Sequence, residues 1–196
     1  EERFSLKGNS QVKGQYQIQG GIASIVLNDW AVETSMDETM LHEALHHLTM
    51  DALTAPATPE QKMFARQLRT VHLEAVRKYN SFLRLVPSSI WKTVVDKKLG
   101  LGAIERQLAS LPSEAFTDLT REEATKISEI LYASSQKKGV GMLEYGLSNV
   151  DEFASSLTNP DFQKLLNAMQ ASERTRVSPE RRSLWDQIVK LFVDFF

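Results

Sequence analysis

Three of the chain's four histidines lie in one short stretch, and two of them frame a glutamate. Residues 42–46 read His-Glu-Ala-Leu-His, the H-E-x-x-H pattern. Side chains four residues apart on an α-helix lie one turn apart on the same face, so His42 and His46 could hold one metal ion. Glu43 could then take a proton from a water that the ion activates. The pattern predicts a hydrolytic zinc site; the alternative is a charged helical face that binds no metal.

A catalytic zinc site needs a third protein ligand besides the two histidines. The Gly-x-x-His extension is absent, because His-Leu-Thr-Met follows His46. We choose Glu152, which lies near the start of a predicted helix with Phe153 and Leu157 facing inward. Two alternatives stay open: Glu152 could only satisfy the dipole of that helix, and His72 could serve as the ligand instead of being a structural histidine.

The region around Glu152 carries a family resemblance. Residues 149–153 read Asn-Val-Asp-Glu-Phe, and residues 157–163 read Leu-Thr-Asn-Pro-Asp-Phe-Gln. Together with the His-Glu-x-x-His segment, they resemble gluzincin metallopeptidase domains found in the large polyvalent proteins of bacteriophages and mobile elements. The resemblance covers the two motifs well and the region between them loosely. It implies a zinc peptidase fold with Glu152 as the third ligand and a helical insertion between the motifs.

Tyr145 lies seven residues before Glu152. A similar spacing occurs in lethal-factor-like peptidases, and this resemblance would make Tyr145 the phenol that donates to the oxyanion. Gly139, Gly141 and Gly146 predict a loop here that can approach a cleft. A tyrosine packed at the edge of the domain is the alternative.

Three further polar residues flank the motifs. His47 should point about 100° away from His46 on an ideal helix, which makes it a poor co-ligand. Asp151 and Glu144 are candidates to accept hydrogen bonds from the ligand imidazoles.

The elements that must position these residues are predicted to be mostly helical from Ser35 onward. The N-terminal region before them has the pattern of β-strands. Alternating and β-branched residues between glycines predict short strands in residues 1–34. Ser35 and Glu38 form a capping-box pattern that opens the motif helix. Further helices are expected at 59–85, 89–98, 104–111, 121–134, 149–157, 162–171 and 179–196. The predicted class is therefore α+β, a mostly helical zincin-like domain with a small N-terminal sheet.

We expect a single domain of 196 residues. Its parts are a β-sheet in 1–34, the active-site helix in 35–55, a helical insertion in 56–140, and the third-ligand and C-terminal helices in 141–196. The apolar C-terminal residues, 191–196, suggest a domain cut from a longer polypeptide with flanking domains. A terminal helix docked on the core explains them equally well.

Composition narrows the function classes. The net charge of −2 and the dispersed basic residues disfavour nucleic-acid binding. The absence of cysteine excludes disulfides and a Cys-type zinc site. No apolar run is long enough for a membrane span, and the first residues lack signal-peptide character. These features favour a cytoplasmic or virion-associated location.

The sequence therefore predicts a zinc metallopeptidase that acts on a protein or peptide substrate, an endopeptidase in preference to an exopeptidase. Glu43 and Tyr145 would be catalytic, and His42, His46 and Glu152 would bind the zinc. One alternative is an inactive peptidase-fold interaction or structural module of a phage-type polyprotein. Another is a helical scaffold with a fortuitous motif.

Overall fold

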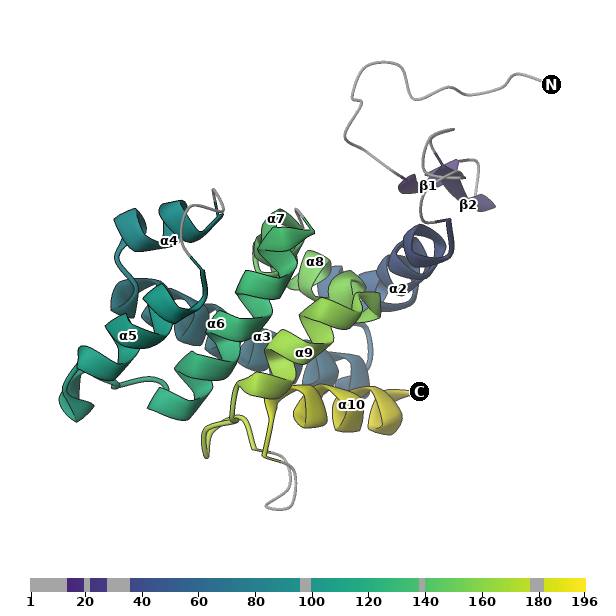
Figure 1. Cartoon of the computed structure of the whole chain (residues 1–196). Coiled ribbons are helices and arrows are strands. Elements are labelled where there is room, and N and C mark those ends of the chain that lie inside the picture. The colour runs from purple at the N-terminus through teal and green to yellow at the C-terminus, as the bar shows by residue number, and fades with distance from the viewer. Residues whose placement is uncertain (1–13, 20–21, 28–35, 96–99, 138–139, 177–181) are drawn as a thin grey trace.

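The computed structural model describes residues 14–19, 22–27, 36–95, 100–137, 140–176 and 182–196. These residues form nine α-helices, which build the body of the molecule (Figure 1). The helices are α2 (Met36–Thr54), α3 (Pro59–Leu85), α4 (Ser88–Val95), α5 (Gly102–Ser110), α6 (Arg121–Gln136), α7 (Val140–Gly146), α8 (Val150–Ser155), α9 (Pro160–Ala168) and α10 (Leu184–Phe195). Short 3₁₀ turns cover Ser113–Ala115 and Ser156–Thr158.

The predicted α+β class is wrong, because the molecule is all-α in its body. The strands in the described part, β1 (Gly14–Gln19) and β2 (Ile22–Leu27), pair only with each other as one antiparallel hairpin. The buried hydrophobic core of the described residues begins at Ala52 and comes from helices and their connections. The alternating polar and apolar residues between glycines predicted paired strands, but two strands alone cannot supply a layer of the core. Residues 1–13, 20–21 and 28–34 of the expected sheet, and Ser35 of the expected capping box, lie outside the described residues.

Helix α3 is the central element, and its sequence shows why it forms. Thr58 and Gln61 make a reciprocal capping box, and Pro59 starts the first turn with a fitting backbone angle. Its buried side chains recur at helical spacing, including Leu68, Val71 and Ala75. The helix therefore presents one continuous apolar face to the rest of the body.

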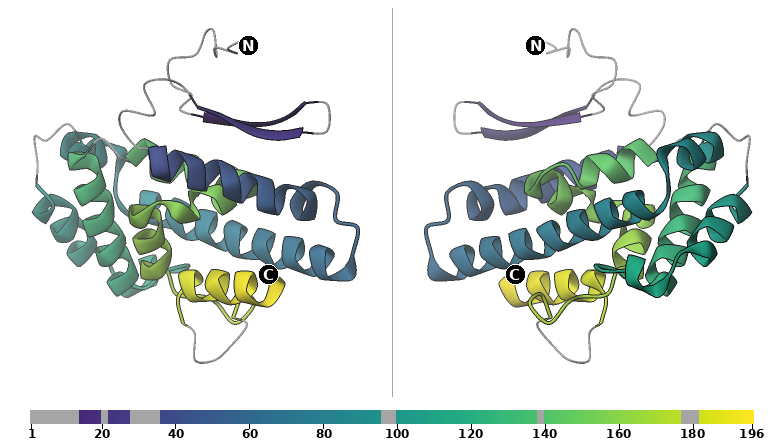
Figure 2. Two further views of the ribbon diagram at one scale, coloured as in Figure 1. Left: turned by 90° about the vertical axis from the view of Figure 1, so that its right-hand side faces the viewer. Right: turned by 90° about the vertical axis from the view of Figure 1, so that its left-hand side faces the viewer.

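The other helices pack around α3 in layers. Figure 2 shows the hairpin, α2, α3 and α10 one after another across the molecule. Helix α10 docks on α3 through aromatic contacts, with the rings of Phe64 and Phe195 stacked at 4.2 Å and Phe192 edge-on at 5.3 Å. Helix α8 contacts both α2 and α3, so the chain folds back to place α8 beside the motif helix. None of the described helices has the length and apolar character that crossing a bilayer requires.

Candidate metal centre

Helix α2 carries the two motif histidines on one face. His42 and His46 are half-buried, with 19% and 20% of their side chains exposed. Their rings meet edge-on, with centroids 4.8 Å apart and planes at 77°. Thr49 and Leu53 continue the same side of the helix into the buried interior. The four-residue spacing thus places both imidazoles at the contact between α2 and α8.

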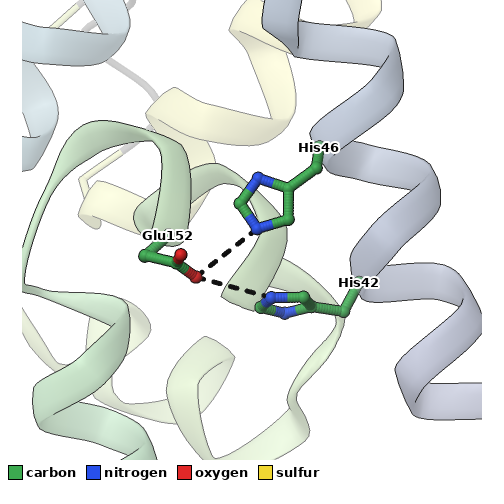
Figure 3. Close-up of side chains that lie close together, drawn as sticks. All are labelled: His42, His46 and Glu152. Carbon is green, nitrogen blue, oxygen red and sulfur yellow. Dashed lines mark ion pairs between the residues drawn. The ribbon is translucent and has the colours of Figure 1, made fainter. Parts of the chain in front are cut away.

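Helix α8 presents Glu152 to these imidazoles from the opposite side (Figure 3). The N-cap residue Asn149 accepts hydrogen bonds through Oδ1 from the backbone N–H groups of Asp151 and Glu152, both at 3.0 Å. Phe153, the next residue, is fully buried and anchors the first turn. Glu152 Oε2 lies 3.5 Å from His42 Nε2 and 3.4 Å from His46 Nε2.

The three side chains fit a divalent metal. Their ligand atoms lie within 4.8 Å of one another, and this is the group that the described residues offer for an ion. Tetrahedral zinc with bonds of about 2.0–2.2 Å holds neighbouring ligand atoms about 3.3–3.5 Å apart, close to the two distances from Glu152. Glu152 Oε2 is also buried without a hydrogen-bond partner among the described residues. Two imidazoles and one carboxylate are a donor set of catalytic zinc, although these ligands alone do not fix the metal.

The charges in this cluster act on one another. Burial alone would raise the pKa of Glu152, but its interactions with His42, His46 and Tyr145 hold that pKa well below its usual range. Burial alone would lower the pKa of His46, but the charges of Glu152, Glu43 and Asp151 leave it raised. Without an ion, the carboxylate therefore stabilises positive charge on His46.

Glu43 lies beside the cluster without belonging to the group of three. It is buried, with 7% of the residue exposed, and it shares helix α2 with both histidines. Its negative charge raises the pKa of His46 and also that of Tyr145. Glu43 is thus close enough to both residues for its charge to act on them.

Tyr145 lies at the rim of the same site, on α7, and is 47% exposed. Partial burial raises the pKa of its phenol, and the pairing with Glu152 and the charge of Glu43 raise it further. The hydroxyl therefore stays protonated and able to donate at neutral pH. A role as a donor to an oxyanion remains a prediction.

The predicted loop around Tyr145 is instead helix α7. Gly146 ends this helix where a side chain has no room: an added Cβ would meet Phe162 and Ser156 at 2.8 Å. Gly141 is in the helix with open space around it, and Gly139 lies outside the described residues. The glycines were interpreted as signs of a loop, but Gly146 serves close packing between α7 and the elements that follow.

The other polar candidates lie elsewhere. His72 is not a member of the cluster: its Nε2 donates to the backbone oxygen of Leu147 at 3.0 Å. Glu144 accepts from the Tyr79 hydroxyl at 2.9 Å, not from a ligand imidazole. His47 is exposed on α2 and is not a member of the cluster. Asp151 influences His46 through its charge, and its role as an acceptor stays a prediction.

Sequence reasoning missed the residues that hold the ligands in place. Asn149 was given no role, although an asparagine followed by two acidic residues is a recognisable start of a helix. The contact between His72 and Leu147 joins distant parts of the chain, so no local pattern could reveal it.

A scan against protein-family models found no match for this chain, and neither did searches of curated proteins and of solved structures.

Proposed function

We propose that this protein is a zinc-dependent peptidase of the gluzincin type, in which His42, His46 and Glu152 bind the ion. The proposal depends on one observation above all: a buried carboxylate oxygen without a hydrogen-bond partner faces two imidazole nitrogens at 3.4 and 3.5 Å. Buried polar atoms in native proteins are nearly always hydrogen-bonded, so an exception calls for an explanation. A cation supplies one, since it would bond all three atoms together.

The residues around this group have the types that peptide hydrolysis needs. A bound zinc ion acidifies water and polarises a carbonyl group. To Glu43, which is buried beside His42 on α2, we assign the role of taking the proton of the attacking water and later giving it to the leaving amine. To Tyr145, kept protonated by its raised pKa, we assign the role of donating a hydrogen bond to the developing oxyanion.

The decisive experiment compares wild-type protein with Glu43→Gln, both loaded with zinc. Cleavage of a fluorescein-labelled casein substrate and of a mixed quenched-fluorescence peptide library is measured alongside zinc content. We expect Glu43→Gln to keep its zinc and to lose at least about 100-fold in cleavage rate, since general acid–base groups contribute about 10²–10⁴-fold. Undiminished cleavage by this variant would remove Glu43 from the mechanism.

Tyr145→Phe in the same assay separates the donor role from simple packing. The ring is kept and only the hydroxyl is lost, so we expect kcat to fall by about 100-fold with little change in KM. An unchanged kcat would leave Tyr145 as a surface tyrosine. Zinc binding by the wild type without any cleavage would favour the alternative, an inactive peptidase-fold module.

A further inference from the structure

We propose that His72 is the positioning residue of the metal site: from α3 it fixes α8 so that Glu152 meets the two histidines of α2. The inference rests on the proposed zinc site and adds to it the device that sets metal affinity. His72 was a candidate ligand on sequence grounds, and its contacts give it this different role.

His72 holds the start of α8 in two ways. Its Nε2 donates to the backbone oxygen of Leu147, at 3.0 Å, in the short link between α7 and α8. Its ring also packs edge-on against the ring of Phe153, with centroids 5.2 Å apart. Phe153 directly follows Glu152 and is fully buried. One side chain on α3 therefore touches the chain on both sides of the proposed ligand.

A second contact from α3 lies seven residues further along. The Tyr79 hydroxyl donates to Glu144 Oε1 at 2.9 Å, and Tyr79 is buried. Residues seven apart on a helix lie two turns apart on nearly the same face, so His72 and Tyr79 both face the α7–α8 segment. Tyr79 holds the segment at α7, and His72 holds it next to Glu152.

Such support matters because α8 is short. It spans only Val150–Ser155, and an isolated helix of this length is unstable in water. The Asn149 cap orders its first turn but does not tie that turn to the rest of the protein. His72 supplies this tie from the long, well-packed helix α3. Residues that orient metal ligands commonly change metal affinity about 10–100-fold when they are replaced.

The test measures Zn²⁺ affinity of the full chain by competition with a chromogenic chelator, for wild type, His72→Leu and His72→Gln. Leucine removes the donor, and glutamine can still donate to the Leu147 oxygen. We expect His72→Leu to weaken zinc binding about tenfold or more and His72→Gln to stay within about threefold of wild type. The visible spectrum of the Co²⁺-loaded protein should change in the leucine variant and be restored in the glutamine variant.

Ser81→Ala is the matched control on the same helix. Ser81 is buried like Tyr79 and donates to Asp118 Oδ2 at 2.8 Å, away from the metal cluster. This variant loses that bond and the one that Ser81 Oγ accepts from Arg84. Both lie away from the metal cluster, so we expect wild-type zinc affinity and an unchanged Co²⁺ spectrum. Equal losses of affinity in Ser81→Ala and His72→Leu would overturn the inference, because any weakening of α3 would then suffice.

Hydrogen exchange without metal distinguishes failure of this inference from failure of the proposed function. The Phe153 amide donates to the Asn149 backbone oxygen at 2.9 Å, so it reports the order of α8. We expect it to exchange faster in His72→Leu and at the wild-type rate in His72→Gln. If the wild type binds no zinc, the proposed function fails and this exchange alone decides the positioning role. Unchanged exchange or unchanged zinc affinity in the leucine variant contradicts the role of His72.

Discussion

Two carboxylates in this molecule, the buried Glu123 and the half-buried Glu152, have opposite surroundings. Glu123 on α6 is fully partnered: Oε1 accepts from Lys78 Nζ at 2.9 Å and from the Gln170 amide at 2.8 Å, and Oε2 accepts from the Thr120 amide at 2.7 Å. Glu152 on α8 has a buried oxygen without any hydrogen-bond partner among the described residues, facing two imidazoles. Glu123 has the surroundings of a structural group, and Glu152 has those of a ligand.

This difference indicates that the contacts of Glu123 stabilise the fold, whereas those of Glu152 do not serve that purpose alone. Removing a carboxylate from water is costly unless donors replace the water. Around Glu123 two backbone amides and an ammonium do so. Around Glu152 the groups within reach are the two imidazoles and the Tyr145 phenol, and the Oε2 atom that faces the imidazoles has no hydrogen bond among the described residues. A cation shared by the three side chains would account for the second arrangement.

The largest expected effect comes from removing the partnered carboxylate. Glu123→Ala leaves Lys78 buried beside no counter-charge, since only 7% of that lysine side chain is exposed. Breaking a buried pair in this way costs about 3–5 kcal/mol, so we expect that loss in urea unfolding. Zinc affinity of the folded fraction should stay at the wild-type value. A loss below about 1 kcal/mol would mean that Glu123 is no more structural than Glu152, and the comparison would fail.

Lowering the pH should reduce the free energy of unfolding by less than Glu123→Ala does. Burial alone would raise the pKa of Glu123, but the Thr120 amide, Lys78 and the Gln170 amide leave it lowered. The unfolded chain, with a glutamate pKa of about 4.3, then binds a proton more readily than the folded one. The stabilisation from Glu123 is therefore complete above that pH and lost as the pH falls towards the lowered folded value.

Urea unfolding of wild type and Glu123→Gln, from about pH 6 to about pH 3, measures this contribution. Glutamine does not titrate, so the variant should lose stability with acid less steeply than the wild type. Because Glu152 and other carboxylates also titrate, some slope should remain. Identical slopes in the two proteins would show that the contacts of Glu123 do not favour its charged form.

Much of this structure could be predicted from local patterns in the sequence. The helix around His42 and His46, the start of α3 at Pro59, and the helix start before Glu152 follow from spacing and residue type. The chemistry of zinc called for a third ligand from elsewhere in the chain, for which Glu152 was chosen and His72 was the alternative, and Glu152 is the one that lies beside the histidines. These features are local or are demanded by the chemistry of one site.

Features that depend on packing between distant segments were not predictable. Gly146 looked like a loop residue because only the fold shows that Phe162 and Ser156 fill the space around it. The alternating pattern at the N-terminus predicts strands, which suggested an α+β domain. Whether those strands form part of the core depends on packing that the pattern does not encode. The role of His72 depends on a contact with Leu147, which is far away in the sequence.

The central claim is that His42, His46 and Glu152 bind a metal ion together. Zinc titration of metal-free wild type and Glu152→Ala, followed by calorimetry and by elemental analysis after dialysis, tests it most directly. We predict about one tightly bound zinc per wild-type chain and an affinity at least about 100-fold weaker in the variant. Tight stoichiometric zinc in Glu152→Ala, or none in the wild type, would contradict the claim.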